Sequence, residues 1–193
     1  AIGDVTEAYK RLGIVNNEIQ QGTVMASGSL DEIINAFDNL AGQDVSSWAQ
    51  QRSQTLVDQR VPENVWVEGV DQTVKALHQQ GYKLGIVTSD TKKGVEQFLT
   101  DTNMHKYFDV VISTEANAVE KPNPEVLKPL FDNYDVDSSD VMIVGDTAND
   151  IKTGKNAQLG LSVAVLTGVD IKETFTEADY ILPTANQVLD ILN

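Results

Sequence analysis

The spacing of apolar residues changes near residue 65. Before that point the spacing is helical and no segment indicates a strand; one apolar run is Leu30, Ile33, Ile34, Phe37 and Leu40. Aspartate or serine followed three residues later by glutamate marks a helix start, as at 4–7 and 29–32. A third helix is expected over 46–59, ahead of Pro62. The pattern predicts a small helical domain over residues 1–64.

After residue 65, short runs rich in Val and Ile alternate with helical stretches. Strands are expected at 83–88, 109–113, 141–144, 162–166 and 179–182. Helices are expected at 70–80, 92–101, 124–133, 148–157, 170–176 and 185–192. Short, almost wholly apolar strands separated by helices are typical of a parallel sheet that is covered on both faces. Residues 65–193 are therefore predicted to form a doubly wound α/β core.

The composition narrows the possible partners. The chain has 14 Lys plus Arg against 29 Asp plus Glu, a formal charge of −15, which disfavours nucleic acid and anionic membrane surfaces. It has no cysteine, so disulfides and thiolate chemistry are excluded. We find no membrane span and no signal peptide in the sequence, and expect a soluble, cytoplasmic protein. The oligomeric state is not indicated.

Candidate functional residues lie where predicted strands end, because ligands of such sheets bind at the carboxyl edge. Thr88 and Ser89 follow the first strand, where a hydroxyl and the amides of the next helix can hold a phosphate oxygen or simply cap that helix. Lys121 stands just before the helix start formed by Asn123 and Pro124. There it either neutralises an anion or is a solvated lysine in a turn.

The third strand end, GDTAND at 145–150, carries two carboxylates. Gly145 lets the backbone turn sharply, so that Asp146 lies at the sheet edge and Asp150 on the first turn of the next helix. A divalent cation best offsets the charge repulsion between two converging carboxylates, and oxygen ligands favour Mg²⁺. The alternative is an ordinary strand-to-helix turn with aspartate caps.

In this order, a hydroxyl after one strand, KPNPE at 121–125 and GDTAND at 145–150 resemble the haloacid dehalogenase-like hydrolase superfamily. Within the superfamily, the chain resembles the phosphoglycolate-phosphatase-like branch, and this resemblance covers nearly the whole chain. It implies an α-helical cap domain over 1–64 and a Rossmann-like core over 65–193. It also implies Mg²⁺-dependent hydrolysis of a small phosphate monoester through an aspartyl-phosphate.

The resemblance assigns a role to each candidate residue. Thr88 would hydrogen-bond the transferring phosphoryl group, with the Ser89 backbone N–H beside it. Lys121 would balance the charge on nucleophile and phosphate. Asp146 would be a direct Mg²⁺ ligand, and Asp150 a ligand or a partner acting through water. The residues expected to support this loop are Gly145 and Thr147.

One departure from the superfamily is large. The DxDGT motif, which ends the first core strand and holds the nucleophile, the general acid and a metal ligand, is absent. That strand lies between the strands ending at Thr88 and Gly145, so its absence leaves a one-strand gap whose unpaired buried groups cost about 1–3 kcal/mol each. A fragment of a longer protein is favoured over a strand supplied by another chain or a catalytically dead relative. The 193-residue chain itself is expected to be inactive.

Other functions share this pattern. A non-catalytic binding or regulatory module would keep the phosphate site without a nucleophile, and a sugar-phosphate mutase uses the same core with a different cap. A dehalogenase would not need both Asp146 and Asp150. The turn at 22–29, GTVMASGS, is expected to face the active site, but its small neutral residues fit a small phosphate ester no better than several alternatives.

Overall fold

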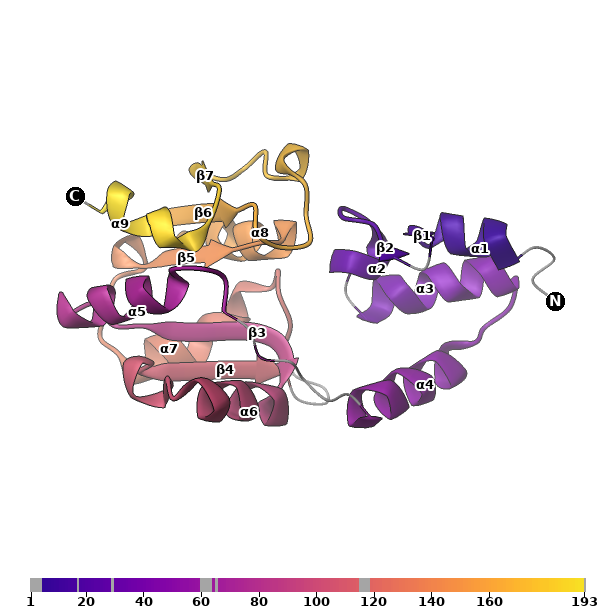
Figure 1. The fold of residues 1–193 in the computed structure, drawn as a ribbon, viewed down its shortest axis with the longest axis horizontal. Helices are drawn as coiled ribbons and strands as arrows, with labels where there is room; N and C mark the ends of the chain where they lie inside the picture. The colour runs from indigo at the N-terminus through magenta and orange to yellow at the C-terminus, as the bar shows by residue number, and fades with distance from the viewer. Residues whose placement is uncertain are drawn as a thin grey trace. The chain divides into compact units, whose positions relative to one another are not determined.

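The computed structural model describes residues 5–16, 18–28, 30–59, 64, 66–114 and 119–192 (Figure 1). The chain divides into two compact units. The first comprises Ala1–Pro62 together with Val169–Thr174, and the second comprises Glu63–Gly168 together with Phe175–Asn193. Among the described residues, no helix combines the length and apolarity that are needed to cross a membrane.

The first unit is built mainly from helices. They are α1 (Val5–Arg11), α2 (Val24–Ser27), α3 (Leu30–Ala41) and α4 (Ser46–Gln59). The amphipathic pattern of α3 places Ile34 in the interior, where it is buried. Helices α3 and α4 contact each other, and the rings of Phe37 and Trp48 meet edge to face with centroids 6.1 Å apart. The helices expected from the apolar spacing are thus present.

Two details of this unit differ from the expectation. A short antiparallel pair, β1 (Ile14–Val15) with β2 (Glu18–Ile19), stands where no strand is predicted. Two-residue strands are too short for an alternating pattern to reveal them. The segment 22–29, for which no helix is predicted, contains the helical turn α2. The predicted capping residues Asp4 and Ser29 lie outside the described residues.

The second unit contains the predicted parallel strands. They are β3 (Gly85–Thr91), β4 (Val110–Thr114), β5 (Met142–Gly145), β6 (Leu161–Val165) and β7 (Tyr180–Leu182). Strand β3 pairs with β4, and β5, β6 and β7 form a second sheet in that order (Figure 1). Every predicted strand is observed with small shifts at its ends. The predicted α/β fold class is confirmed.

Helices connect these strands. They are α5 (Val70–Gln79), α6 (Lys92–Thr102), α7 (Lys128–Asn133), α8 (Ala148–Asn156) and α9 (Val188–Ile191), with the short 3-10 turns η1 (His105–Tyr107), η2 (Pro124–Leu127), η3 (Ser138–Asp140) and η5 (Ala185–Gln187). The helix predicted over 170–176 is wrong. That stretch holds the 3-10 turn η4 (Lys172–Thr174). Asp170 is buried in the first unit and Phe175 in the second, so residues near the two ends of the stretch pack in different units.

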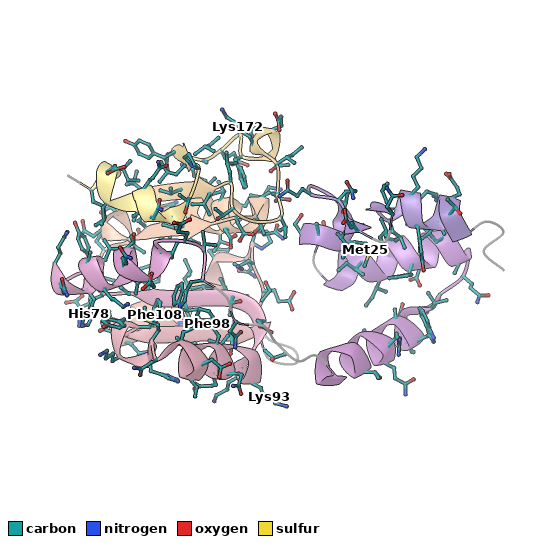
Figure 2. All side chains as sticks on the ribbon, in the orientation of Figure 1. Met25, His78, Lys93, Phe98, Phe108 and Lys172 are labelled. Carbon is teal, nitrogen blue, oxygen red and sulfur yellow. The ribbon has the colours of Figure 1, made fainter. Side chains whose placement is uncertain are left out.

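The apolar core of the second unit forms separate clusters. One consists of Val95, Leu99 and Met104, with Phe98 and Phe108 among the partly buried residues packed against it (Figure 2). The other consists of Ile151, Ala164 and Phe175, beside the sheet that contains β6. Strand β6 lies between β5 and β7, and its Val163 and Ala164 are fully buried. This placement explains why β6 is almost wholly apolar.

Strands β3 and β5 each have an open side. Among the described residues, β3 is paired with β4 alone and β5 with β6 alone. This is the position at which the family resemblance places a further, central strand. The residues of β5 are partly exposed, in contrast to those of the neighbouring β6. Partly exposed apolar strands with open edges are able to accept an additional strand.

At the amino ends of the sheets, two aspartates join neighbouring parallel strands in the same way. The Asp109 amide donates to the Leu84 carbonyl at 2.7 Å, and its carboxylate accepts from the Leu84 amide at 3.0 Å. The Asp179 amide donates to the Ser162 carbonyl at 2.8 Å, and its carboxylate accepts from the Ser162 amide at 2.7 Å. Each aspartate therefore fixes the strand that follows it to the strand beside it.

These bonds predict a specific acid sensitivity. The pKa of Asp109 is lowered mainly by the hydrogen bond from the Leu84 amide and, to a smaller extent, by Lys83. The pKa of Asp179 is lowered mainly by Lys155 and, to a smaller extent, by the hydrogen bond from the Ser162 amide. A lowered pKa in the folded state gives stabilisation that is complete above the unfolded pKa and disappears as the pH falls through the folded pKa. In urea unfolding, the variant carrying Asp109→Asn and Asp179→Asn should therefore lose less stability than the original chain between about pH 4.5 and pH 2.5.

The matched control is Asp132→Asn, because Asp132 is exposed and contacts only Lys128 within its own helix in the bonds described. This variant should keep the pH dependence of the original chain. An unchanged pH dependence in the Asp109 and Asp179 double variant would contradict the role given to these two carboxylates.

Candidate active site

The third predicted strand end folds as a compact turn. Strand β5 ends at Gly145, and α8 begins at Ala148 with Thr147 as its N-cap. The Thr147 hydroxyl accepts from the Asp150 amide at 3.2 Å, while Asp150 Oδ2 accepts from the Thr147 amide at 2.9 Å and from its hydroxyl at 2.7 Å. This capping box fixes Asp150, whose residue is only 6% exposed, on the first turn of α8.

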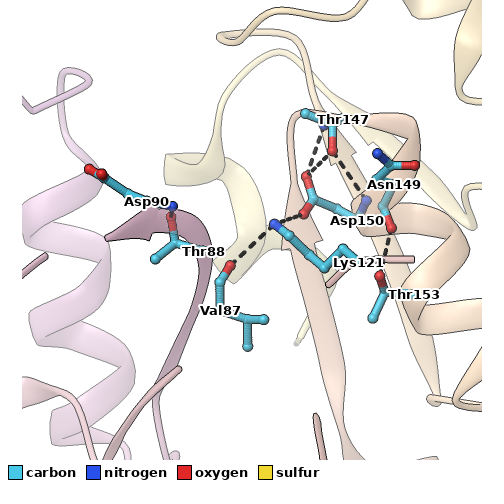
Figure 3. Close-up of polar contacts among 8 residues, drawn as sticks. All are labelled: Val87, Thr88, Asp90, Lys121, Thr147, Asn149, Asp150 and Thr153. Carbon is cyan, nitrogen blue, oxygen red and sulfur yellow. Dashed lines mark hydrogen bonds and ion pairs between the residues drawn. The ribbon is translucent and has the colours of Figure 1, made fainter. Parts of the chain in front are cut away.

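Lys121 reaches this carboxylate from the second predicted strand end. Its Nζ donates to Asp150 Oδ1 at 2.6 Å and to the Val87 carbonyl of β3 at 3.3 Å (Figure 3). The backbone beside Lys121 is also held by α8, because Asn156 Nδ2 donates to the Pro122 carbonyl at 2.9 Å. Residues predicted from two separate motifs therefore meet beside β3 and beyond the carboxyl end of β5.

The pair between Lys121 and Asp150 is buried. The two side chains are 12% and 8% exposed. Desolvation of two charges is costly, and the mutual attraction offsets it only when further hydrogen bonds satisfy both groups. Here Asp150 Oδ2 accepts two hydrogen bonds from Thr147, and the ammonium group of Lys121 also donates to the Val87 carbonyl. The arrangement thus holds a positive charge at the sheet edge in a fixed place.

The first predicted strand end differs from the expectation. Strand β3 continues to Thr91, and α6 begins at Lys92 with Thr91 as its N-cap, so Thr88 and Ser89 do not stand at a helix start. The register of β3 with β4 shifts between Val87 and Thr91, which is a bulge. Thr88 Oγ1 accepts from the Asp90 amide at 3.1 Å.

Two glycines bring the backbone close to the carboxylates of GDTAND. A Cβ at Gly145 would overlap the side chain of Asp150, and a Cβ at Gly168 would overlap the carboxylate of Asp146. Gly145 ends β5, and Gly168 follows β6, the strand beside it. Close approach of backbone to a side chain requires glycine at both places.

Three contributors to this site were not foreseen from the sequence. They are the Val87 carbonyl, the Asn156 amide and Gly168. A backbone carbonyl has no signature in a sequence, and Asn156 reads as an ordinary residue near a helix end. Gly168 was the detectable one, because it follows an apolar strand as Gly145 does.

Comparison with known sequences identifies relatives of this chain. The family description "Haloacid dehalogenase-like hydrolase" matches residues 5–165. A pyrophosphatase PpaX from Halalkalibacterium halodurans is 35% identical over 127 residues, which is 65% of this chain and 59% of the relative. A phosphoglycolate phosphatase from Vibrio vulnificus is 32% identical over 126 residues, 64% of this chain and 54% of the relative. The chain thus spans less than two thirds of the length of these curated relatives.

Solved structures agree on the fold. A predicted phosphoglycolate phosphatase from Haemophilus somnus superposes with a TM-score of 0.70 at 19% identity, over 97% of this chain and 88% of that one. A haloacid dehalogenase-like family protein from Streptococcus pneumoniae gives a TM-score of 0.68 at 16% identity, over 96% and 87%. The match to the family extends over most of the sequence, and the two motifs that meet at the site lie within it. The chain belongs to the haloacid dehalogenase-like hydrolase family.

Proposed function

We propose that this chain is the larger part of a Mg²⁺-dependent phosphatase that hydrolyses a small phosphate monoester. The observation that carries the proposal is the buried ammonium group of Lys121, held by Asp150 and the Val87 carbonyl where β3 and β5 end. A fixed positive charge at this edge stabilises the negative charge of a phosphoryl group during its transfer. Phosphoryl transfer depends mainly on such positioning and charge neutralisation.

The residues around Lys121 are proposed to bind the phosphoryl group and to hold Lys121 in place. The Thr88 hydroxyl and the Ser89 amide, in the bulge of β3, are proposed to bind oxygens of the phosphoryl group. Asp150 is proposed to hold Lys121 in place, because one of its oxygens faces the ammonium group. Thr147 keeps Asp150 in that orientation through the capping box.

The carboxylates at this edge fit Mg²⁺ by their chemistry. Mg²⁺ prefers oxygen ligands and is usually bound through one or two protein carboxylates, with water and substrate oxygens completing its coordination. Asp146 is proposed as the direct ligand. Both oxygens of Asp150 already accept hydrogen bonds, which favours a role through water. When bound, Mg²⁺ would polarise the phosphoryl oxygens and neutralise their charge.

The nucleophile is proposed to come from a segment outside these 193 residues. The open sides of β3 and β5 support this proposal, since one parallel strand between them would join both sheets and end beside Lys121. An aspartate at its carboxyl end would attack phosphorus while the bond from phosphorus to the ester oxygen breaks, and a general acid of the same segment would protonate that leaving oxygen. Water would then hydrolyse the aspartyl-phosphate to inorganic phosphate and free aspartate. Without that segment the site is that of a binding module, which is the alternative function.

The relatives support the class of substrate. One is named a pyrophosphatase and another a phosphoglycolate phosphatase, and both names denote small phosphorylated compounds. The formal charge of −15 gives no attraction for polyanions, so a substrate would be held by the local charge of Lys121 and Mg²⁺.

The first measurement is the intact mass of the protein purified from its source, followed by an assay with a chromogenic aryl phosphate. A mass above 21.1 kDa by a strand and a turn should accompany Mg²⁺-dependent hydrolysis. Asp146→Asn and a chelator should each lower kcat/KM by at least about 100-fold, because both remove charge stabilisation of the transition state. The 193-residue chain alone should show no turnover.

Asp132→Asn is the control, since Asp132 pairs with Lys128 on the surface of α7. It should leave kcat/KM unchanged. Hydrolysis that survives both the chelator and Asp146→Asn would refute the proposed function. Phosphate binding without turnover by the heavier protein would establish the binding module instead.

The fixed position of Lys121 can be tested without any activity. Lys121→Met and Asp150→Asn should each destabilise the chain by about 3–5 kcal/mol, because each leaves a buried charge without its partner. The double variant should lose less than the sum, with a coupling energy above about 1 kcal/mol in urea unfolding.

The exposed pair between Lys128 and Asp132 provides the comparison, at 61% and 56% exposure. Its coupling energy should be about 0.3–0.5 kcal/mol, as for other exposed pairs one helical turn apart. A coupling between Lys121 and Asp150 no larger than this would show that their ion pair does not fix the ammonium group.

A further inference from the structure

Asp170 is a buried carboxyl group with no role in the proposed site. The residue is 5% exposed, and its Oδ1 accepts a hydrogen bond from Ser27 Oγ at 2.7 Å. The preceding carbonyl, that of Val169, accepts from the Gly22 amide at 2.9 Å. Val169–Thr174 belongs to the same compact unit as Gly22 and Ser27. Two consecutive residues from the end of β6 are therefore bound to the segment that contains α2.

The residue just before this segment lies against the proposed metal ligand. Gly168 approaches the Asp146 side chain so closely that a Cβ at Gly168 would overlap the carboxylate. Val169 alone separates Gly168 from Asp170, and one residue spans at most about 3.6 Å. Whatever holds Asp170 therefore also limits where Gly168 can lie.

The segment 22–28 depends on its hydrogen bonds to Val169 and Asp170 to stay ordered. Helix α2 has four residues, from Val24 to Ser27, and an isolated helix of that length is not stable in water. Its Thr23 N-cap makes no side-chain capping bond. The buried carboxyl group of Asp170 in turn requires hydrogen-bond partners, because desolvation without them is costly. The order of α2 and of the residues after β6 is thus linked in both directions.

We propose that Ser27 and Asp170 form a clasp that positions Gly168 and, through it, the Asp146 carboxylate. In this role Ser27 and Asp170 are positioning residues, and the segment 22–28 influences the site without contributing a ligand to it. The consequence for Mg²⁺ binding rests on the proposed function, whereas the mechanical link between the clasp and the turn after β5 does not.

The test is hydrogen exchange, followed by mass spectrometry, in the 193-residue chain and its Ser27→Ala variant. The reporter is the turn 145–150, which contains the Thr147 amide bonded to Asp150. Loss of the clasp should speed exchange roughly tenfold in 22–28, in 168–171 and also in 145–150, as expected for loss of a hydrogen bond to a carboxyl group. Exchange in α6, within residues 95–102, should not change.

Two variants serve as matched controls. Ser46→Ala removes another serine-to-carboxylate bond of the same unit, that from Ser46 Oγ to Asp38 Oδ2 at 3.3 Å, and should leave the turn 145–150 unchanged. Ser27→Thr retains a hydroxyl and should restore the original exchange. If Ser27→Ala fails to fold, Asp170→Asn, which keeps an acceptor oxygen, should show the same pattern with a smaller increase.

Faster exchange confined to 22–28 and 168–171 would overturn the proposal, because the bond would then be a local structural contact. An equal increase in all segments, α6 included, would overturn it as well. Mg²⁺ titration by calorimetry of the heavier protein, which includes the missing segment, provides a separate readout: the clasp predicts at least about threefold weaker Mg²⁺ binding in its Ser27→Ala variant than in its Ser46→Ala variant. Absence of Mg²⁺ binding in that heavier protein would count against the proposed function and leave the exchange result intact.

Discussion

The buried ammonium group of Lys121 is the constraint on which the arrangement of the site depends. It lies between the Val87 carbonyl of one sheet and the Asp150 carboxylate beyond the end of the other. A lysine that is 12% exposed requires an anionic partner, and that partner must itself be held by further hydrogen bonds. The Thr147 capping box provides them. The turn after β5, the start of α8 and the loop after β4 are therefore fixed together.

The sequence predicts the strands well because burial on both faces leaves a clear record. The runs that became β4, β5 and β6 are short and nearly all apolar, and no helix of useful length fits them. The expectation failed where contacts far apart in the sequence decide local structure. The stretch 170–176 looks helical, yet burial of Asp170 in one unit and Phe175 in the other prevents a regular helix.

The residues of the site are likewise predicted only in part from the sequence. The sequence points to Lys121, Asp146 and Asp150 because the segments that lead from parallel strands into the next helices gather at one edge of the sheet. Strand β3 ends three residues beyond its predicted end, because a bulge extends it to Thr91. A bulge has no reliable pattern in a sequence. The direct partner of Asp150 was also not foreseen, because distance in the sequence does not reveal which oxygen faces which ammonium group.

Glycine explains how this edge can be both crowded and ordered. Gly145 and Gly168 follow or end neighbouring parallel strands, and each lies against one carboxylate of the GDTAND turn, Asp150 and Asp146 respectively. Because a side chain at either glycine would occupy the space of a carboxylate, the backbone itself forms the wall that limits the movement of these groups. The position of this backbone depends on the contacts that hold the chain on either side of it. Gly145 is anchored by the β-ladder with β6, whereas Gly168 lies beyond that ladder and directly before Val169, whose carbonyl accepts a bond from Gly22. The sheet therefore sets the position of the backbone beside Asp150, and under the proposed clasp the hydrogen bonds of Val169 and Asp170 limit the position of the backbone beside Asp146.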